Sequence, residues 1–468
     1  MVPLLAERTS NILLGKVRDG LPVTKGEQAK LALLLALPAI ISQLVTIVME
    51  NVDSAMVGHL GAAASASIGL VSTSTWLMGG ICSSLAGGFA VLVAQSIGAN
   101  DFNRAQTILK KAVFFTFCLS LTFGIIGCVI SPYLPVWLGG GEDIRKDATI
   151  YFLVFSASIP VWEMNFLMAA MLRSSGNMLV PSVVNMCVCL LNVVFNYVFI
   201  FVLGLGVLGA ALGTLCAVLL SAIVLVVYVF LFSKELSPLH LRKVKQDDME
   251  SAAPVLRPAL HIGIPMAVQH IAICSAHIIT TLIVAPLGTV AIAAHAFGIT
   301  IEGLCYMPGY GIGDAATTLI GQSIGAKRPD LRHSFSYITL LLAVAFMTFM
   351  GILMYCGVPW LMPLMTPDTA VQMLTVECLR IEAFAEPMYA ASIVIFSIFV
   401  GAGDTKVPAA MNLGSIWLVR LPLALILARY IGLRGVWIAM CAELCFRGFI
   451  FIIRLLRKEP LMCKSVNV

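Results

Sequence analysis

The chain contains 468 residues, of which 60% are hydrophobic and only 11% are charged, with a formal net charge of +5. A soluble domain carries about 25% charged residues, so this composition excludes an ordinary soluble protein and predicts an integral membrane protein. The basic residues lie in short gaps between apolar stretches and form no aromatic-rich basic face. This pattern argues against nucleic-acid binding and makes the lipid bilayer the expected partner.

Twelve apolar stretches follow a polar N-terminal segment, residues 1–27, which lacks the features of a cleaved signal peptide. Each stretch is long enough to cross a hydrocarbon core of about 30 Å as a helix. They fall at about 28–56, 66–94, 108–130, 149–171, 179–203, 208–232, 259–286, 291–320, 335–358, 372–399, 406–428 and 433–455. A polar linker, 233–258, separates an N-lobe (28–232) from a C-lobe (259–455), and residues 456–468 form a tail.

Lys and Arg are distributed very unequally between the two sides of the membrane. With the N-terminus placed in the cytoplasm, 22 of them fall on the cytoplasmic side and four on the opposite side. Cytoplasmic loops carry an excess of Lys and Arg in membrane proteins. We therefore expect a multi-pass protein of the cell (cytoplasmic) membrane with both termini in the cytoplasm.

The two halves of the chain are copies of one another. Pro38 and Pro265 are 227 positions apart, and the pentapeptide Gln-Ser-Ile-Gly-Ala recurs with the same separation, at 95–99 and 322–326. Copies of six spans share one orientation, so we expect an all-α integral membrane protein with twelve transmembrane helices in two pseudo-symmetric six-helix lobes. Such lobes commonly rock about a central site in transporters, although channels and membrane enzymes can also be duplicated.

These features together resemble the multidrug and toxic compound extrusion (MATE) family. The resemblance is carried by Pro38 with residues 50–58 (Glu-Asn-Val-Asp-Ser-Ala-Met-Val-Gly), by the twin pentapeptides, and by residues 172–177 (Leu-Arg-Ser-Ser-Gly-Asn) with their counterpart 401–406 (Gly-Ala-Gly-Asp-Thr-Lys). It extends from about residue 30 to 455. It implies a secondary active antiporter that exports cationic or amphipathic small molecules, such as drugs and toxins, in exchange for protons or sodium.

Asp53 in the first span is the first candidate for a coupling site, because ionisable residues inside a membrane are costly and are functional candidates. Asn192 and Asn196 share one face of the fifth span, and Thr214 lies near the start of the sixth, all at a depth similar to that of Asp53. A carboxylate held in a low dielectric could alternate between protonated and ionised forms, and the surrounding oxygens could instead help to coordinate sodium. The resemblance implies that Asp53 is the cation-coupling acid and that Asn192, Asn196 and Thr214 are its neighbours.

The nature of the coupling ion follows from departures from the family pattern. Family members often have a second Asp where this chain has Asn196. With one negative charge fewer, we expect protons rather than sodium as the coupling ion. We expect no cofactor. Some members also bind sodium through two acids of the C-lobe, but Ile273 and Tyr389 stand at those places here. Pro38 removes a backbone hydrogen bond in mid-span and is a candidate hinge, with a static kink as the alternative.

Four further acids could meet a cationic substrate in a central cleft: Glu163, Glu386, Glu302 and Asp314. Each also has a plain structural interpretation. Glu163 could bond a neighbouring helix, Glu386 could belong to ion pairs within its own span (with Glu377, Arg380 and Glu382), and Glu302 and Asp314 could lie near wet helix ends. Arg420 is expected to pair with one of these acids.

His270 and His277 lie seven residues apart on one face of the seventh span, where either could relay protons. Structural histidines, either paired or with a single hydrogen bond, are the alternative.

Other functional classes find little support in the sequence. Residues 204–209 fit G-x-G-x-x-G but join two membrane spans, without the strand and βαβ unit of a dinucleotide site. The seven His are scattered and the 13 Cys form no C-x-x-C pair, so we expect no metal site and no disulfide. We therefore expect a monomeric transporter and not an enzyme. A lipid-linked glycan flippase of a related group is the alternative, and a membrane-embedded enzyme or an ion channel is the alternative from another class.

Overall fold

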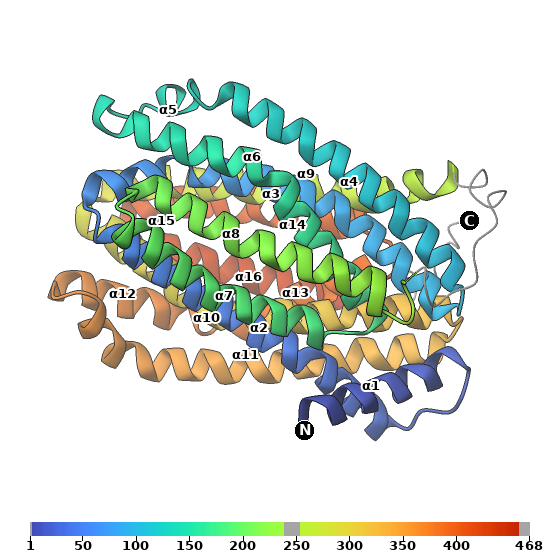
Figure 1. Cartoon of the computed structure of the whole chain (residues 1–468). Coiled ribbons are helices and arrows are strands. Elements are labelled where there is room, and N and C mark those ends of the chain that lie inside the picture. The colour runs from blue at the N-terminus through green and yellow to red at the C-terminus, as the bar shows by residue number, and fades with distance from the viewer. Residues whose placement is uncertain (1, 238–252, 458–468) are drawn as a thin grey trace. The chain divides into compact units, whose positions relative to one another are not determined.

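The structure is a computed structural model that describes residues 2–237 and 253–457. Within these ranges the regular elements are all helical, and the helices are joined by short turns (Figure 1). Most of the expected linker, 233–258, and of the expected tail, 456–468, lies outside the described residues.

The first half of the chain forms a short helix and then six long helical segments. The short helix is α1 (Val2–Arg18), and a four-residue helix, α5 (Leu134–Trp137), lies between two of the long ones. The long segments are α2 (Lys25–Gly58), α3 (Ala62–Gly98), α4 (Phe102–Ile130), α6 (Glu142–Ser175), α7 (Leu179–Tyr197) continued by η1 (Val198–Val202), and α8 (Gly206–Val227) continued by η2 (Tyr228–Phe232).

The second half repeats this order with more interruptions. It comprises α9 (Ala253–Val284) followed by η4 (Ala285–Leu287), α10 (Thr289–Gly325), α11 (Pro329–Met365), α12 (Thr369–Glu382), α13 (Glu386–Gly401), α14 (Lys406–Ser415), η5 (Ile416–Arg420), α15 (Leu421–Ile431) and α16 (Leu433–Leu456).

Eleven of these helical segments within the described residues are long and apolar enough to cross a membrane, and α12 with α13 forms one further, bent span. The expected twelve spans are confirmed when this pair is counted as one. The span expected at about 372–399 is bent, because α12 and α13 meet at an angle of 58°. Pro387 lies in the first turn of α13, where its ring and missing N–H prevent α12 from continuing.

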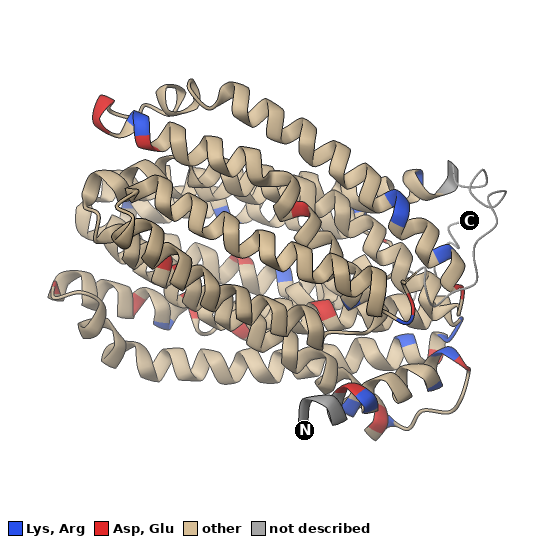
Figure 2. Cartoon of the chain, viewed as in Figure 1, with Lys and Arg blue, Asp and Glu red and all other residues tan. Residues whose placement is uncertain are grey.

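The helix α1 was not expected from the polar composition of the N-terminal segment. It buries a narrow apolar face made of Leu13, Leu14 and Val17. Three buried residues are too few to stand out by hydropathy, but their spacing places them on one side of a helix. Figure 2 shows that charged residues are frequent in α1, whereas the long helices are mostly uncharged and carry only isolated charges in their interiors.

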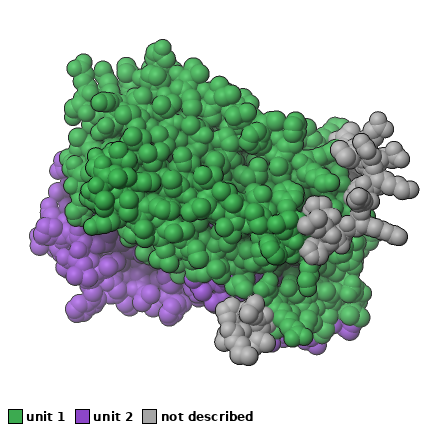
Figure 3. All heavy atoms as spheres, in the orientation of Figure 1, with its two compact units in different colours: residues 1–21, 44–270, 321–327 green, residues 22–43, 271–320, 328–468 purple. Residues whose placement is uncertain are grey.

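The chain divides into two compact units (Figure 3). Unit 1 comprises residues 1–21, 44–270 and 321–327, and unit 2 comprises residues 22–43, 271–320 and 328–468. This division differs from the lobes expected from the duplication because α2, α9 and α10 are each shared between the units. In unit 1, α6 packs against α3, α4 and α8; in unit 2, α13 packs against α11 and α16.

Close helix packing in unit 1 depends on glycine at one position of α3. A Cβ atom added at Gly88 would lie 2.2 Å from the carbonyl oxygen of Ala259 in α9 and 3.2 Å from the backbone nitrogen of Gly263. Small residues let membrane helices approach to backbone contact. Gly88 therefore fixes the distance between α3 and the first part of α9.

We predict that Gly88→Ala lowers the stability of the protein, since overpacking costs about 1–3 kcal/mol. The matched control is Gly69→Ala in the same helix, where an added Cβ meets nothing within 4 Å. Alanine favours helix over glycine, so this control should melt at the parental temperature or above it. Thermal unfolding of the purified protein in detergent measures both, and equal melting temperatures for the two variants would contradict the packing assignment.

Candidate functional site

Asp53, Asn192, Asn196 and Thr214 form one hydrogen-bonded cluster inside unit 1. Asn196 donates through Nδ2 to Oδ1 of Asp53 at 2.9 Å. Both amides are almost completely buried, whereas Asp53 and Thr214 are half-buried. The four residues come from α2, α7 and α8, so three spans meet at this cluster, which we call the Asp53 site.

The amide of Asn192 lies between Asp53 and Thr214. One of its two terminal atoms is 2.6 Å from Oδ1 and 3.1 Å from Oδ2 of Asp53, and the other is 3.0 Å from Oγ1 of Thr214. Oxygen and nitrogen of an amide are distinguished by their hydrogen-bond partners. With nitrogen toward Asp53, the amide donates to the carboxylate; with oxygen toward Asp53, it accepts from Nδ2 of Asn196 at 3.1 Å and donates to Thr214.

Gly213 makes room for the Asp53 site. This role of Gly213 is not evident from the sequence. A Cβ atom added at this position of α8 would lie 2.1 Å from Oδ1 of Asn196 and 2.9 Å from its backbone nitrogen. The side chain of Asn196 therefore lies directly against the backbone of α8. Gly213 immediately precedes the predicted Thr214, but only the packing of α7 on α8 reveals its role.

Pro38 lies within α2, which continues as a helix on both sides of it. Pro38 falls in the part of α2 that belongs to unit 2, whereas Asp53 falls in the part that belongs to unit 1. Because proline has no N–H, the backbone bond that would close this turn of the helix is missing.

Glu163 of α6 is buried and bonds a neighbouring helix. Its Oε1 accepts a hydrogen bond from the hydroxyl of Ser83 in α3 at 3.0 Å, while Oε2 has no hydrogen-bond partner among the described residues. Glu163 therefore makes the contact with a neighbouring helix that its structural interpretation predicts.

Unit 2 contains a separate group of buried charges centred on Glu443 of α16. Arg447, one turn further along α16, places Nε 3.2 Å from Oε1 of Glu443, and Arg420 places Nε 4.0 Å from Oε2. Ser415 donates a further hydrogen bond to Oε1. The ring of Tyr389, which occupies a position where some family members have an acid, lies against Arg447 with 5.4 Å between the guanidinium carbon and the ring centroid.

The expectation that Arg420 pairs with one of the candidate cleft acids or their neighbours is wrong. Its ion-pair partner is Glu443 of the last span, which is not one of those acids. Glu302, Glu382 and Glu386 are nevertheless buried in unit 2. Glu302 and Glu382 both interact electrostatically with Arg420, so these acids lie near the Glu443 group.

The alternative interpretation of Glu386, ion pairing within its own span, does not hold among the described residues. Neither carboxylate oxygen of Glu386 or of Glu382 has a hydrogen-bond partner among the described residues. Glu377 pairs instead with Arg434 at 2.6 Å, and Arg380 lies over the ring of Tyr355. The break between α12 and α13 separates Glu386 from these residues.

The remaining candidates are dispersed. His270 places Nε2 3.1 Å from the carbonyl oxygen of Trp76, against Gly80, where an added Cβ would lie only 1.8 Å from that nitrogen. His277 is exposed and belongs to unit 2, whereas His270 belongs to unit 1. Asp314 is half-buried in α10 and has a polar or charged partner of its own. The structure does not join these three residues to the Asp53 site.

Within residues 2–237 and 253–457, no group of three or more His, Cys, Asp or Glu side chains lies close enough together to hold a metal ion.

The helical membrane fold, its internal duplication and the buried polar site in the first half are the features expected of a membrane transporter. The sequence matches the MatE family over residues 38–198 and 265–426, once in each half. The chain therefore belongs to the multidrug and toxic compound extrusion (MATE) family of efflux transporters and is not an enzyme.

Individual relatives agree with this assignment. The chain is 26% identical to the "Probable multidrug resistance protein NorM" of Thermotoga maritima over 428 residues, covering 88% of this chain and 89% of that protein. The Vibrio cholerae MATE transporter VcmN in the bent form superposes with a TM-score of 0.83 at 20% identity, covering 93% of this chain and 98% of that one. A MOP superfamily transporter from Pyrococcus furiosus superposes with a TM-score of 0.85 at 19% identity, covering 92% and 95%. These likenesses confirm the expected two-lobed all-α fold.

We predict that Glu443→Gln destabilises the protein, because breaking a buried ion pair costs about 3–5 kcal/mol. The matched control is Glu377→Gln, which breaks a pair whose side chains are 43% and 56% exposed. An exposed pair contributes only about 0–1 kcal/mol. The melting temperature in detergent should fall clearly for Glu443→Gln and hardly for Glu377→Gln, and the reverse order would refute the assignment of Glu443 as the central acid of unit 2.

A second prediction concerns Gly213→Ala, which should push Asn196 away from Asp53. A hydrogen bond to a charged group contributes about 1.5–3 kcal/mol, so gradient-driven transport should slow by roughly ten- to a hundredfold. Gly79→Ala, where an added Cβ meets nothing within 4 Å, is the control. Transport into proteoliposomes at equal amounts of folded protein measures the effect, and an unchanged rate would show that this contact does not matter.

Proposed function

We propose that the chain exports cationic or amphipathic small molecules in exchange for protons, with Asp53 as the coupling acid. The observation that carries this proposal is that the heavy atoms of the Asp53 site accommodate two hydrogen-bond patterns around the carboxyl group, which differ in the orientation of the Asn192 amide. One fits an ionised Asp53 and the other a protonated Asp53. Proton uptake and release then need only the rotation of an amide and a hydroxyl.

In the ionised pattern, the nitrogen of the Asn192 amide faces Asp53. Asn192 and Asn196 then both donate to the carboxylate, and the hydroxyl of Thr214 donates to the oxygen of Asn192. Bonds from neutral donors stabilise a carboxylate in surroundings where water is scarce. Asp53 can therefore remain charged within the span.

In the protonated pattern, the oxygen of the Asn192 amide faces Asp53 and accepts a hydrogen bond from the carboxyl O–H, with 2.6 Å between the two oxygen atoms. Asn192 donates to Thr214, and Thr214 donates in turn to the carbonyl oxygen of Ala210 at 3.0 Å. A protonated carboxyl group is a hydrogen-bond donor. Each donor in this series of hydrogen bonds, from Asp53 through Asn192 to Thr214, therefore has an acceptor.

Sodium fits the Asp53 site less well than a proton. The site offers one carboxylate, because Asn196 stands where family members often have a second Asp. A hard cation held away from water needs several oxygen ligands, whereas the amide nitrogens of Asn192 and Asn196 are both used as donors to the ionised Asp53. We therefore propose protons as the coupling ion.

The proton could act on the cargo through α2. Residues 44–58 of this helix belong to unit 1 and residues 22–43 to unit 2. In unit 2, the helix packs closely on α10, where a Cβ added at Gly311 would lie 2.7 Å from the backbone nitrogen of Ile40. Pro38 lies beside this contact and is the proposed hinge. A preference of a few kcal/mol for one conformation is enough to shift the populations substantially.

The cargo class is proposed from the family and from the relative named as a multidrug resistance protein. The acids Glu163, Glu302, Glu386 and Asp314 remain candidates for contact with a cation, although Glu163, Glu302 and Glu386 are buried in this conformation. We also propose that the protein acts as a monomer in the cytoplasmic membrane with both termini inside, as the distribution of Lys and Arg indicates.

We predict that Asp53→Asn abolishes proton-driven export, because the amide cannot gain or lose a proton at neutral pH. Efflux of a fluorescent cationic dye from proteoliposomes, with proton and sodium gradients imposed separately, measures this. Glu142→Gln is the control: it removes an exposed acid in the first turn of α6 and should transport at the parental rate.

Two outcomes would contradict this proposal. Unchanged export by folded Asp53→Asn would remove Asp53 from the coupling mechanism. Export driven by a sodium gradient alone would replace the proton as the coupling ion.

A further inference from the structure

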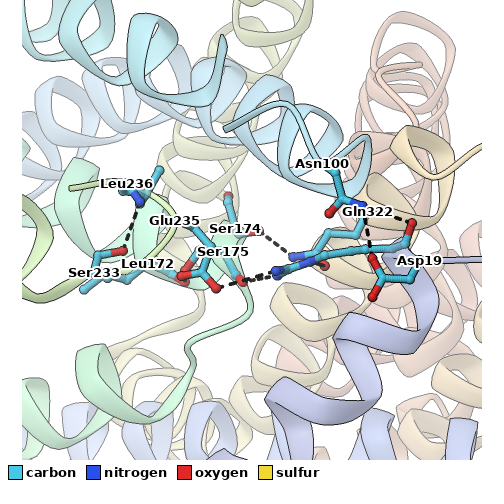
Figure 4. A network of polar contacts seen from close by, with 10 residues as sticks. Asp19, Asn100, Leu172, Ser174, Ser175, Ser233, Glu235, Leu236 and Gln322 are labelled. Carbon is cyan, nitrogen blue, oxygen red and sulfur yellow. Dashed lines mark hydrogen bonds and ion pairs between the residues drawn. The ribbon is translucent and has the colours of Figure 1, made fainter. Parts of the chain in front are cut away.

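Arg18, the last residue of α1, connects this helix to three other segments of unit 1. Its guanidinium donates through Nη2 to the carbonyl oxygen of Ser175 at 2.8 Å and through Nε to Oε1 of Gln322 at 3.2 Å. Nη1 lies 3.5 Å from Oε1 of Glu235. Figure 4 shows these partners converging from the end of α6, the end of α10 and the segment after η2.

The contacts with α6 satisfy a helix C-terminus, where the last carbonyl groups lack partners within the helix and attract cations. The amide of Gln322 donates to the carbonyl oxygen of Ser174 at 2.9 Å, beside the bond from Arg18 to Ser175. The helix ends at Gly176, with φ of +94°, and a Cβ there would lie 2.2 Å from Cδ1 of Leu14 in α1. Hence α1 and Gln322 together cover the end of α6.

Arg18 is a cation with little exposure to solvent, so its charge needs partners to avoid a cost in free energy. Its side chain is 10% exposed. Burial lowers the pKa of the guanidinium from its ordinary value, and Glu235 opposes that shift. Breaking a buried charged contact is costly because the remaining charge is left unpaired.

The end of α10 also touches the end of α3 through the duplicated pentapeptides. A Cβ added at Gly98 would lie 2.2 Å from the carbonyl oxygen of Gln322, and one added at Gly325 would lie 1.9 Å from that of Gln95. The two contacts are equivalent under the duplication. Only glycine allows the two backbones to approach in this way.

The rest of α10 belongs elsewhere, since residues 271–320 are part of unit 2 and residues 321–327 are part of unit 1. We propose that Arg18 is a positioning residue for transport, which holds the end of α10 on unit 1 and keeps the two pentapeptides together. Any transport step that separates the pentapeptides also breaks the bond between Arg18 and Gln322. This inference needs transport by alternating access but not the proposed coupling ion.

Hydrogen exchange of the full-length protein in lipid nanodiscs, read by mass spectrometry, tests the proposal. In Arg18→Gln, exchange in peptides over 95–101 and 320–327 should rise about tenfold or more, since a hydrogen bond to a charged group is lost. Peptides at the opposite helix ends, 57–63 and 284–290, should exchange no faster than in the parent. Arg18→Lys keeps the charge but not the forked donors and should fall between the two.

Arg8→Gln, which removes an exposed cation of the same helix, is the control and should exchange like the parent. Asn100 donates to the backbone oxygen of Arg18 at 3.3 Å and should keep α1 in place in every variant. Faster exchange confined to α1 would overturn the proposal by making Arg18 a mere anchor of that helix. Faster exchange at all helix ends would overturn it by showing general destabilisation. Because no transport is measured, a failure of the Asp53 assignment leaves this test unaffected.

Discussion

A polar side chain that leaves water costs free energy unless it finds a partner, and an unpaired charge costs far more. This constraint explains where the polar residues of the spans lie. Asp53 is met by the amide of Asn196, and Glu443 is met by Arg420 and Arg447. Except for Arg447, each partner comes from another part of the chain, so satisfying the polar groups also decides which helices pack together.

Glycine makes these contacts possible, because a polar group can lie directly against a helix only where no side chain covers the backbone of that helix. Gly213 lets Asn196 lie against α8, and Gly98 lets the end of α3 meet the backbone of Gln322. Both positions lie beside residues that the sequence analysis had singled out. The function of these glycines is geometric: they set the distance at which the polar chemistry occurs.

The spans could be predicted from the sequence because a membrane helix is specified by length and hydropathy alone. The Asp53 site could be predicted because spans of known direction place residues at known depths. Depth does not specify the face of a helix or its neighbours, so the pairing of Arg420 with Glu443 was missed. The short helix α1 was missed because its buried face is small, and the break at Pro387 because proline is tolerated in many membrane helices.

The duplication conserves the order of the long helices in the two halves but not their chemistry. At a separation of 227 residues, Asp53 corresponds to Thr280, whose hydroxyl donates to the carbonyl oxygen of Ala276 in its own helix. Asn192, Asn196 and Thr214 correspond to Val419, Leu423 and Cys441, which cannot rebuild the network. The buried charges of unit 2 instead surround Glu443, and at the same separation Arg420, Glu443 and Arg447 correspond to the uncharged residues Val193, Cys216 and Leu220. Proton coupling through the Asp53 network would therefore be confined to the first half of the chain, and α2, which is shared by both units, is the helix through which a proton there could act on the second half.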